Sequence, residues 1–126
     1  MKKVTVSKSH SSSSTVIVKY CDTFFDKFIG LMFSKGLRQD NGVLLVNSGE
    51  STINASIHMF FMNFDITALW LDKNMVVVDK VVAKKWHPFY YPKKPAKYIL
   101  ELHHSQFPEY SIGDKLVFLN ADDNSS

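Results

Sequence analysis

Cysteine is almost absent from this chain, which has Cys21 alone among 126 residues. A single thiol cannot form a disulfide within the chain, and this favours a reducing compartment. The spaced motifs of common metal and redox sites are also missing, because the sequence contains no H-x-H, H-E-x-x-H or C-x-x-C. The sequence therefore predicts no metal site and no cofactor.

Long apolar runs are lacking as well. The lysines of Met1–Val6 are followed by the serine-rich Ser7–Ser14, not by the apolar core of a signal peptide. The most apolar stretch, Ser56–Asp72, is interrupted by Asn63 and Asp65 and is shorter than the roughly 20 residues that span a bilayer. We therefore expect a soluble, cytoplasmic monomer without a membrane span. The net charge of +3 is by itself a weak argument for nucleic acid.

The apolar and β-branched residues that are present indicate strands. Ser56–Asp72 predicts two strands buried on both faces, Ile57–Phe64 and Thr67–Leu71, with a turn over Asp72–Met75 in which Asn74 takes positive φ. Trp86–Lys97 contains three prolines and cannot form a regular strand. The other predicted strands are Thr15–Tyr20, Val43–Val46, Val76–Val82, Tyr98–Leu102 and Lys115–Leu119.

One helix is expected between Asp22 or Thr23, as the N-cap, and Gly36, as the stop, with Phe24 and Phe28 on its apolar face. The fold class is mainly β (α+β), an antiparallel barrel or two-sheet sandwich of seven to eight short strands with this helix covering an end. Residues 15–120 form the single domain, residues 121–126 a disordered tail, and residues 1–14 a flexible arm. Within that arm, Val4–Val6 is either a short strand or loose chain.

An ordered series of landmarks runs through residues 15–119. The landmarks are Gly30-Leu31-Met32, Gly42-Val43-Leu44-Leu45-Val46, Ile57-His58-Met59-Phe60-Phe61-Met62, Leu69-Trp70-Leu71-Asp72, Ala96-Lys97-Tyr98-Ile99-Leu100-Glu101-Leu102 and Gly113-Asp114. In this order the chain resembles the uncharacterised family known as domain of unknown function 192. The resemblance implies a compact β-barrel-like fold and no established activity.

The chain departs from the family pattern at two places. Family members typically carry an arginine just before Gly-Leu-Met, where this chain has Lys27, Phe28 and Ile29. The family usually reads Pro-Ile-Asp or Pro-Leu-Asp after the central strand, where this chain has Asp65-Ile66-Thr67. A role that depends on the aspartate of this family motif does not carry over to Thr67, which stands in its place.

Two residues in the predicted strands could carry chemistry. Glu101 and Ile99 share one face of their strand, opposite to Tyr98, Leu100 and Leu102. Glu101 points either into the barrel, where it is paired or has a raised pKa, or outward into solvent. His58 is interpreted as a buried, hydrogen-bonded core residue that could also line an interior pocket. Acid–base catalysis would require His58 and Glu101 to converge.

The segment 84–98 is the one surface candidate, because five lysines interleave there with five aromatic residues. Such rings can stack on bases or on sugar faces while lysines contact phosphates. The alternative is a proline-stiffened crossover that caps the barrel. The ligand-binding residues that we predict from sequence are His58, Lys85, Trp86, His87, Tyr90, Tyr91, Tyr98 and Glu101.

These observations favour a non-catalytic ligand-binding or interaction module over an enzyme, because no nucleophile–base set or phosphate-binding glycine loop is present. Its ligand would be a small molecule, a glycan or a protein. The alternatives are an enzyme that uses His58 and Glu101 in a barrel mouth, and weak nucleic-acid binding through the basic aromatic segment 84–98.

Overall fold

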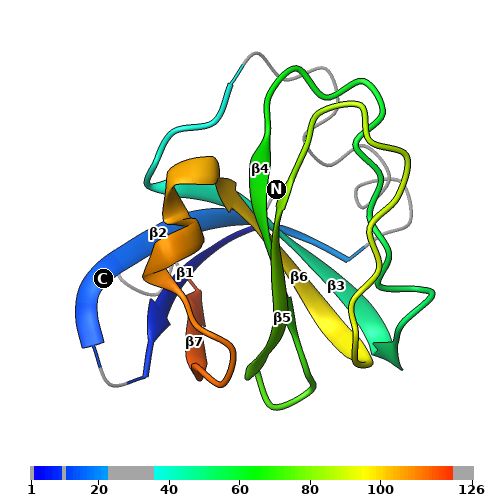
Figure 1. The fold of residues 1–126 in the computed structure, drawn as a ribbon. Helices are drawn as coiled ribbons and strands as arrows, with labels where there is room; N and C mark the ends of the chain where they lie inside the picture. The colour runs from blue at the N-terminus through cyan, green and yellow to red at the C-terminus, as the bar shows by residue number, and fades with distance from the viewer. Residues whose placement is uncertain (1, 10, 23–35, 121–126) are drawn as a thin grey trace.

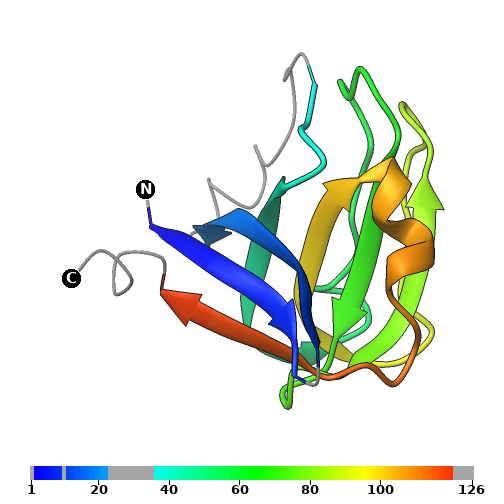
Figure 2. The ribbon, with the colours of Figure 1, turned by 90° about the vertical axis from the view of Figure 1, so that its left-hand side faces the viewer.

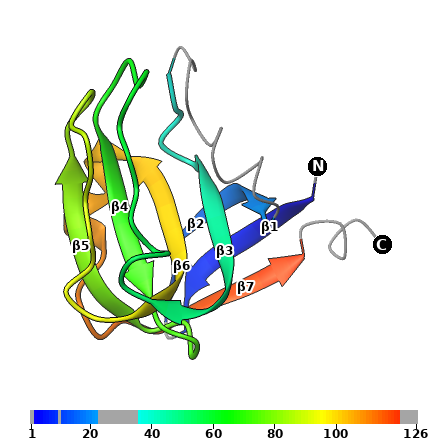
Figure 3. The same ribbon diagram turned by 90° about the vertical axis from the view of Figure 1, so that its right-hand side faces the viewer.

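The computed structural model describes residues 2–9, 11–22 and 36–120. Within them the chain forms a seven-stranded sheet in the order β5-β4-β6-β3-β2-β1-β7. The strands are β1 (Lys3–Lys8), β2 (Ser11–Cys21), β3 (Asn41–Ser51), β4 (Ile66–Leu71), β5 (Val77–Ala83), β6 (Ala96–His103) and β7 (Leu116–Asn120). A 3-10 helix, η1 (His104–Glu109), lies between β6 and β7. The sheet curls into a half-barrel, as Figures 1 to 3 show, so the predicted mainly β fold is confirmed.

All neighbouring strands pair antiparallel except β2 and β3, which run parallel. A parallel pair requires a long crossover, and the chain between Cys21 and Asn41 makes it. The predicted helix falls on residues 23–35 of this crossover and lies outside the described residues. At one end of the half-barrel the edges meet, where Val76 bridges to Lys115 and the Val77 amide donates to the Asp114 carbonyl at 2.9 Å.

The inner core fills the concave side of the sheet and receives side chains from all seven strands. On β6, Tyr98, Leu100 and Leu102 belong to this core, while Ile99 packs on the opposite face, so the predicted alternation of β6 is confirmed. The inner core consists of Val4, Val6, Val16, Val18, Leu44, Val46, Leu69, Leu71, Val77, Tyr98, Leu100, Leu102, Tyr110 and Leu116.

Residues 3–8, which we assigned from sequence to an N-terminal arm, form β1 between β2 and β7. The reason is that Val4 and Val6 both enter the inner core, so the strand alternative for Val4–Val6 holds. The serine-rich residues 11–14 begin β2. Their backbone can pair with a neighbouring strand whatever the side chains are.

The outer core lies on the convex face of β3, β6 and β4, and two loops cover it. Ala55, Ile57, Met59 and Met62 of loop 52–65 pack there, as does Tyr90 of loop 84–95. In Figure 1 both loops run along the right-hand side of the sheet. β4 is buried on both faces, as predicted.

The prediction of a strand over Ile57–Phe64 is wrong. This segment is a loop in which Ile57 makes a single bridge to Tyr90. Ile57, Met59 and Met62 pack on the sheet without belonging to it, and a short apolar run does not distinguish the two cases. The irregular course predicted for residues 86–97 is confirmed over most of its length, since β6 begins only at Ala96.

The turn after β4 was also predicted at the right place but with the wrong left-handed residue. Met75 has φ 65°, whereas we expected Asn74. The Asp72 carboxylate accepts from the Asn74 amide at 2.8 Å and from the Val76 amide at 3.1 Å. These bonds fix the turn through the aspartate side chain, so the positive φ falls one residue later.

Candidate functional site

Backbone hydrogen bonds join loop 52–65 to loop 84–95. The Trp86 amide donates to the Met59 carbonyl at 2.8 Å, and the Met59 amide donates to the His87 carbonyl at 3.0 Å. Further along, Ile57 and Tyr90 exchange a pair of bonds at 3.0 and 2.9 Å. The two loops therefore form one layer whose inner side is apolar and packs on the sheet.

The outer side of this layer carries large aromatic residues that remain in solvent. Phe61 and Trp86 are in contact with ring centroids 5.3 Å apart, and Phe60 contacts Phe89 at 5.9 Å. Tyr91 continues the row, 6.3 Å from Phe89. All five are between 37% and 58% exposed. We call Phe60, Phe61, Trp86, Phe89 and Tyr91 the aromatic platform.

Two members of the platform have a backbone conformation that bulky residues rarely adopt. Phe61 has φ 61° and Trp86 has φ 66°. Such conformations cost on the order of 1–3 kcal/mol each for residues other than glycine and concentrate at functional sites. Both strained residues are exposed, and their rings contact each other. The two positive φ values therefore coincide with two exposed rings in contact.

The charge of the layer is strongly positive. The two loops contain four lysines and one aspartate, a net charge of +3 that equals the charge of the whole chain. The aspartate, Asp65, accepts from the Lys85 amide at 2.8 Å and pairs with the Lys84 amine at 3.5 Å. The hydrogen bond from the Lys85 amide lowers the pKa of Asp65, and the Lys84 charge adds to the effect.

The structure brings most of the predicted loop residues together. Lys85, Trp86 and Tyr91 are exposed on the layer, and the His87 and Tyr90 rings lie 4.3 Å apart. The Tyr90 hydroxyl accepts from the Lys84 amide at 2.9 Å, which gives this ring a role in fixing the loop.

His58 is half-buried in the same layer, with its ring 5.8 Å from that of Phe60. Sequence reasoning missed Phe60 and Phe61, because a strand buried on both faces would hide both rings. A signal was available in the polar residues Asn63 and Asp65, which break the apolar run immediately after them.

Tyr98 and Glu101 are separate from the platform and from each other. Tyr98 faces the inner core and packs edge-on against Phe118, with ring centroids 5.4 Å apart. Glu101 lies on the convex face between Val43 of β3 and Ala68 of β4. It is 7% exposed, and burial raises its pKa from 4.5 to about 7.

His58 does not contribute to the raised pKa of Glu101, so among the described residues the pKa gives no support for the convergence that acid–base catalysis would require. Burial alone accounts for the raised pKa of Glu101. The same described ranges contain no group of three or more His, Cys, Asp or Glu side chains placed to hold a metal ion. They also contain no helix long and apolar enough to cross a membrane.

Solved structures share this fold. A candidate transcription regulator from Sinorhizobium meliloti 1021 superimposes with a TM-score of 0.82 at 16% identity, covering 93% of this chain and 92% of that one. A protein of unknown function from Novosphingobium aromaticivorans gives a TM-score of 0.77 at 17% identity, over 91% and 83% of the two chains.

Sequence relatives agree on one family. A UPF0127 protein from Thermococcus kodakarensis is 49% identical over 84 residues, which is 67% of this chain but only 52% of that protein. A UPF0127 protein from Pyrococcus horikoshii is 38% identical over 88% of this chain and 95% of its own length. The family model DUF192, described as "Uncharacterized ACR", matches residues 5–118. This chain therefore belongs to the DUF192 family, also named UPF0127.

Proposed function

We propose that this protein is a non-catalytic binding module, and that the aromatic platform binds single-stranded nucleic acid. The observation that carries the proposal is the exposed contact between Phe61 and Trp86, both held at positive φ. Bases would stack on the platform rings, and the lysines of loop 84–95 would contact phosphates.

The need to cover the sheet does not explain the platform. Ile57, Met59 and Met62 already cover the outer core from the inner side of the same layer, and each is at most 5% exposed. The platform rings are instead 37–58% exposed, and exposed aromatic rings in contact with one another are unusual on a protein surface without a partner. Because other residues of the layer cover the sheet while the platform rings stay exposed, a recognition surface is favoured over a purely structural crossover.

The chemistry of the layer favours nucleic acid over a glycan. Sugar hydroxyls need carboxylate and amide partners beside the stacking ring, and the sole carboxylate of the two loops, Asp65, is already bonded to Lys84 and Lys85. The layer also carries four lysine amines beside its rings, which match phosphates and bases. The rings are also fixed by backbone bonds, which suits stacking.

Replacing Trp86 tests the proposal directly. Trp86→Gly removes the ring, and glycine suits φ 66°, so the loop backbone keeps its conformation without strain. We expect about a tenfold loss of affinity for a labelled single-stranded oligonucleotide, since one stacked base contributes about 1–3 kcal/mol. Fluorescence anisotropy at low and at physiological salt measures it, and binding to the unchanged protein should weaken steeply with salt.

Ile112→Ala is the matched control, because Ile112 is 59% exposed at the turn before β7 and lies outside the platform. It should bind like the unchanged protein. Equal affinity for duplex DNA would argue against stacking. Binding of oligosaccharides or of vesicles that contain phosphatidylglycerol, with none of the oligonucleotide, would overturn the nucleic-acid proposal and assign the platform to that ligand.

A further inference from the structure

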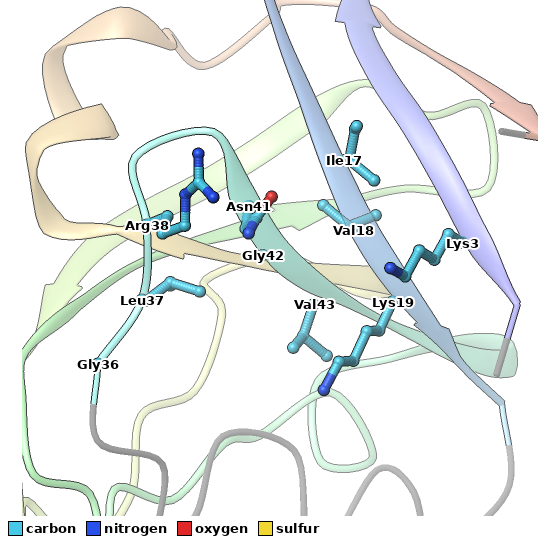
Figure 4. Close-up of a pocket in the computed structure, with 10 residues that line it drawn as sticks. All are labelled: Lys3, Ile17, Val18, Lys19, Gly36, Leu37, Arg38, Asn41, Gly42 and Val43. Carbon is cyan, nitrogen blue, oxygen red and sulfur yellow. The ribbon is translucent and has the colours of Figure 1, made fainter.

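A cavity lies on the convex face where β1, β2 and β3 meet, and it is distinct from the aromatic platform. Its volume is about 320 Å³, a size suited to a small molecule. Lys3, Lys19 and Arg38 come from three different segments and all line the cavity; in Figure 4 Lys3 and Lys19 lie next to each other, and Arg38 lies on the other side of Asn41 and Gly42. None of the platform residues lines it.

The positive charges of this cavity are arranged in an electrostatically unfavourable way. Lys3 on β1 stands directly opposite Lys19 on β2, and like charges in that position repel each other. Among the described residues, no carboxylate lies within ion-pair distance of either amine. Arg38 contacts Asp40 through Nε at 3.3 Å, so one acidic side chain offsets three cations. An anion between the amines would relieve this repulsion.

The other described residues that line the cavity are apolar or neutral. Ile17 is 46% exposed beside the lysines, and the buried Val43 lies one strand further along the wall. Asn41 adds an amide that can donate to an anion or accept from it. This lining combines a cationic rim with an apolar patch, and so it matches a ligand with one charged end and one apolar end.

From this lining we infer a binding site for a small organic anion, one in which a phosphate or carboxylate group is attached to a compact apolar body. The charged group contacts Lys3 and Lys19, and the apolar body contacts Ile17 and Val43. The site shares no residue with the aromatic platform, so it stands whether or not the platform binds nucleic acid.

Phenyl phosphate is the first probe, with benzoate to compare the two anionic groups and benzyl alcohol as the uncharged analogue. In two-dimensional amide spectra we expect saturable shifts at residues 3, 17–19 and 38–43 with phenyl phosphate or benzoate, and none with benzyl alcohol. Shifts spread evenly over the lysine-bearing surface, or confined to loop 84–95, would overturn the inference.

Charge-matched variants separate a built site from general attraction. Lys3→Gln together with Lys19→Gln should weaken phenyl phosphate binding at least tenfold. Lys73→Gln together with Lys115→Gln removes the same charge from exposed positions outside the cavity and should change the affinity less than twofold. Equal losses in the two double variants would contradict the site. Trp86→Gly should leave this binding intact, which keeps the result independent of the platform.

Discussion

Glu101→Gln is expected to make the protein more stable than the unchanged chain at pH 8, by about 3 kcal/mol. Burial between β3 and β4 raises the pKa of the Glu101 carboxyl from 4.5 to about 7, so the folded state favours the neutral acid. Below about pH 4.5 the carboxyl is neutral in both states and folding bears no penalty. The penalty grows as pH rises from 4.5 to 7 and is complete above 7.

Glutamine keeps the shape of the glutamate side chain and stays neutral. It therefore removes the cost of burying the charge only at pH values where that cost exists. Urea denaturation at pH 8 should show the full gain, and at pH 5 the difference should fall below about 1 kcal/mol. The exposed Glu109→Gln serves as the control and should change stability by less than about 0.5 kcal/mol at both pH values. A Glu101→Gln protein that is less stable at pH 8 would show that the carboxylate is ionised and paired in the fold.

Trp70→Ala should have the second large effect, a loss of about 3–5 kcal/mol in the free energy of unfolding. Trp70 is 1% exposed on β4, and its indole Nε1 donates to the Ala55 carbonyl at 2.7 Å. This bond and the packing around it attach loop 52–65 to the sheet. Removal of the Trp70 side chain should therefore also loosen the layer that holds the aromatic platform.

Hydrogen exchange distinguishes that local effect from general destabilisation. Trp70→Ala should speed exchange of the Met59 and Trp86 amides, which join the two loops. Leu100→Ala removes a fully buried residue of the inner core and should cost about 2–5 kcal/mol without selectively exposing those amides. If the loop amides of Trp70→Ala exchange as slowly as those of the unchanged protein, the two loops are held together without the help of the sheet.

The strands that could be predicted from sequence are those whose pattern has one physical explanation. β4 is apolar on both faces and β6 alternates, and both were placed correctly. Residues 57–64 are equally apolar, but they are a loop in which Met59 and Met62 are buried while Phe60 and Phe61 are exposed. Composition alone does not separate these cases, because burial against a sheet and membership of a sheet require the same side chains.

The candidate site was predictable only in part for a related reason. Trp86, Phe89, Tyr91 and the lysines of loop 84–95 are close in sequence, and their exposure follows from the prolines that keep this loop out of the sheet. Phe60 and Phe61 join them through bonds between distant loops, such as that from Trp86 to Met59. The cavity at Lys3 and Lys19 depends on strand register, which residues 16 positions apart do not reveal.

The pairing of β1 with β7 has a consequence for how the chain is made. β1 precedes the other strands of this sheet in the chain, and one of its edges pairs with the next strand, β2. Its other edge pairs with Leu116–Asn120, more than a hundred residues later. Throughout synthesis that edge offers unpaired backbone groups to any passing strand. The half-barrel therefore acquires its last protection against aggregation only when the end of the domain has left the ribosome.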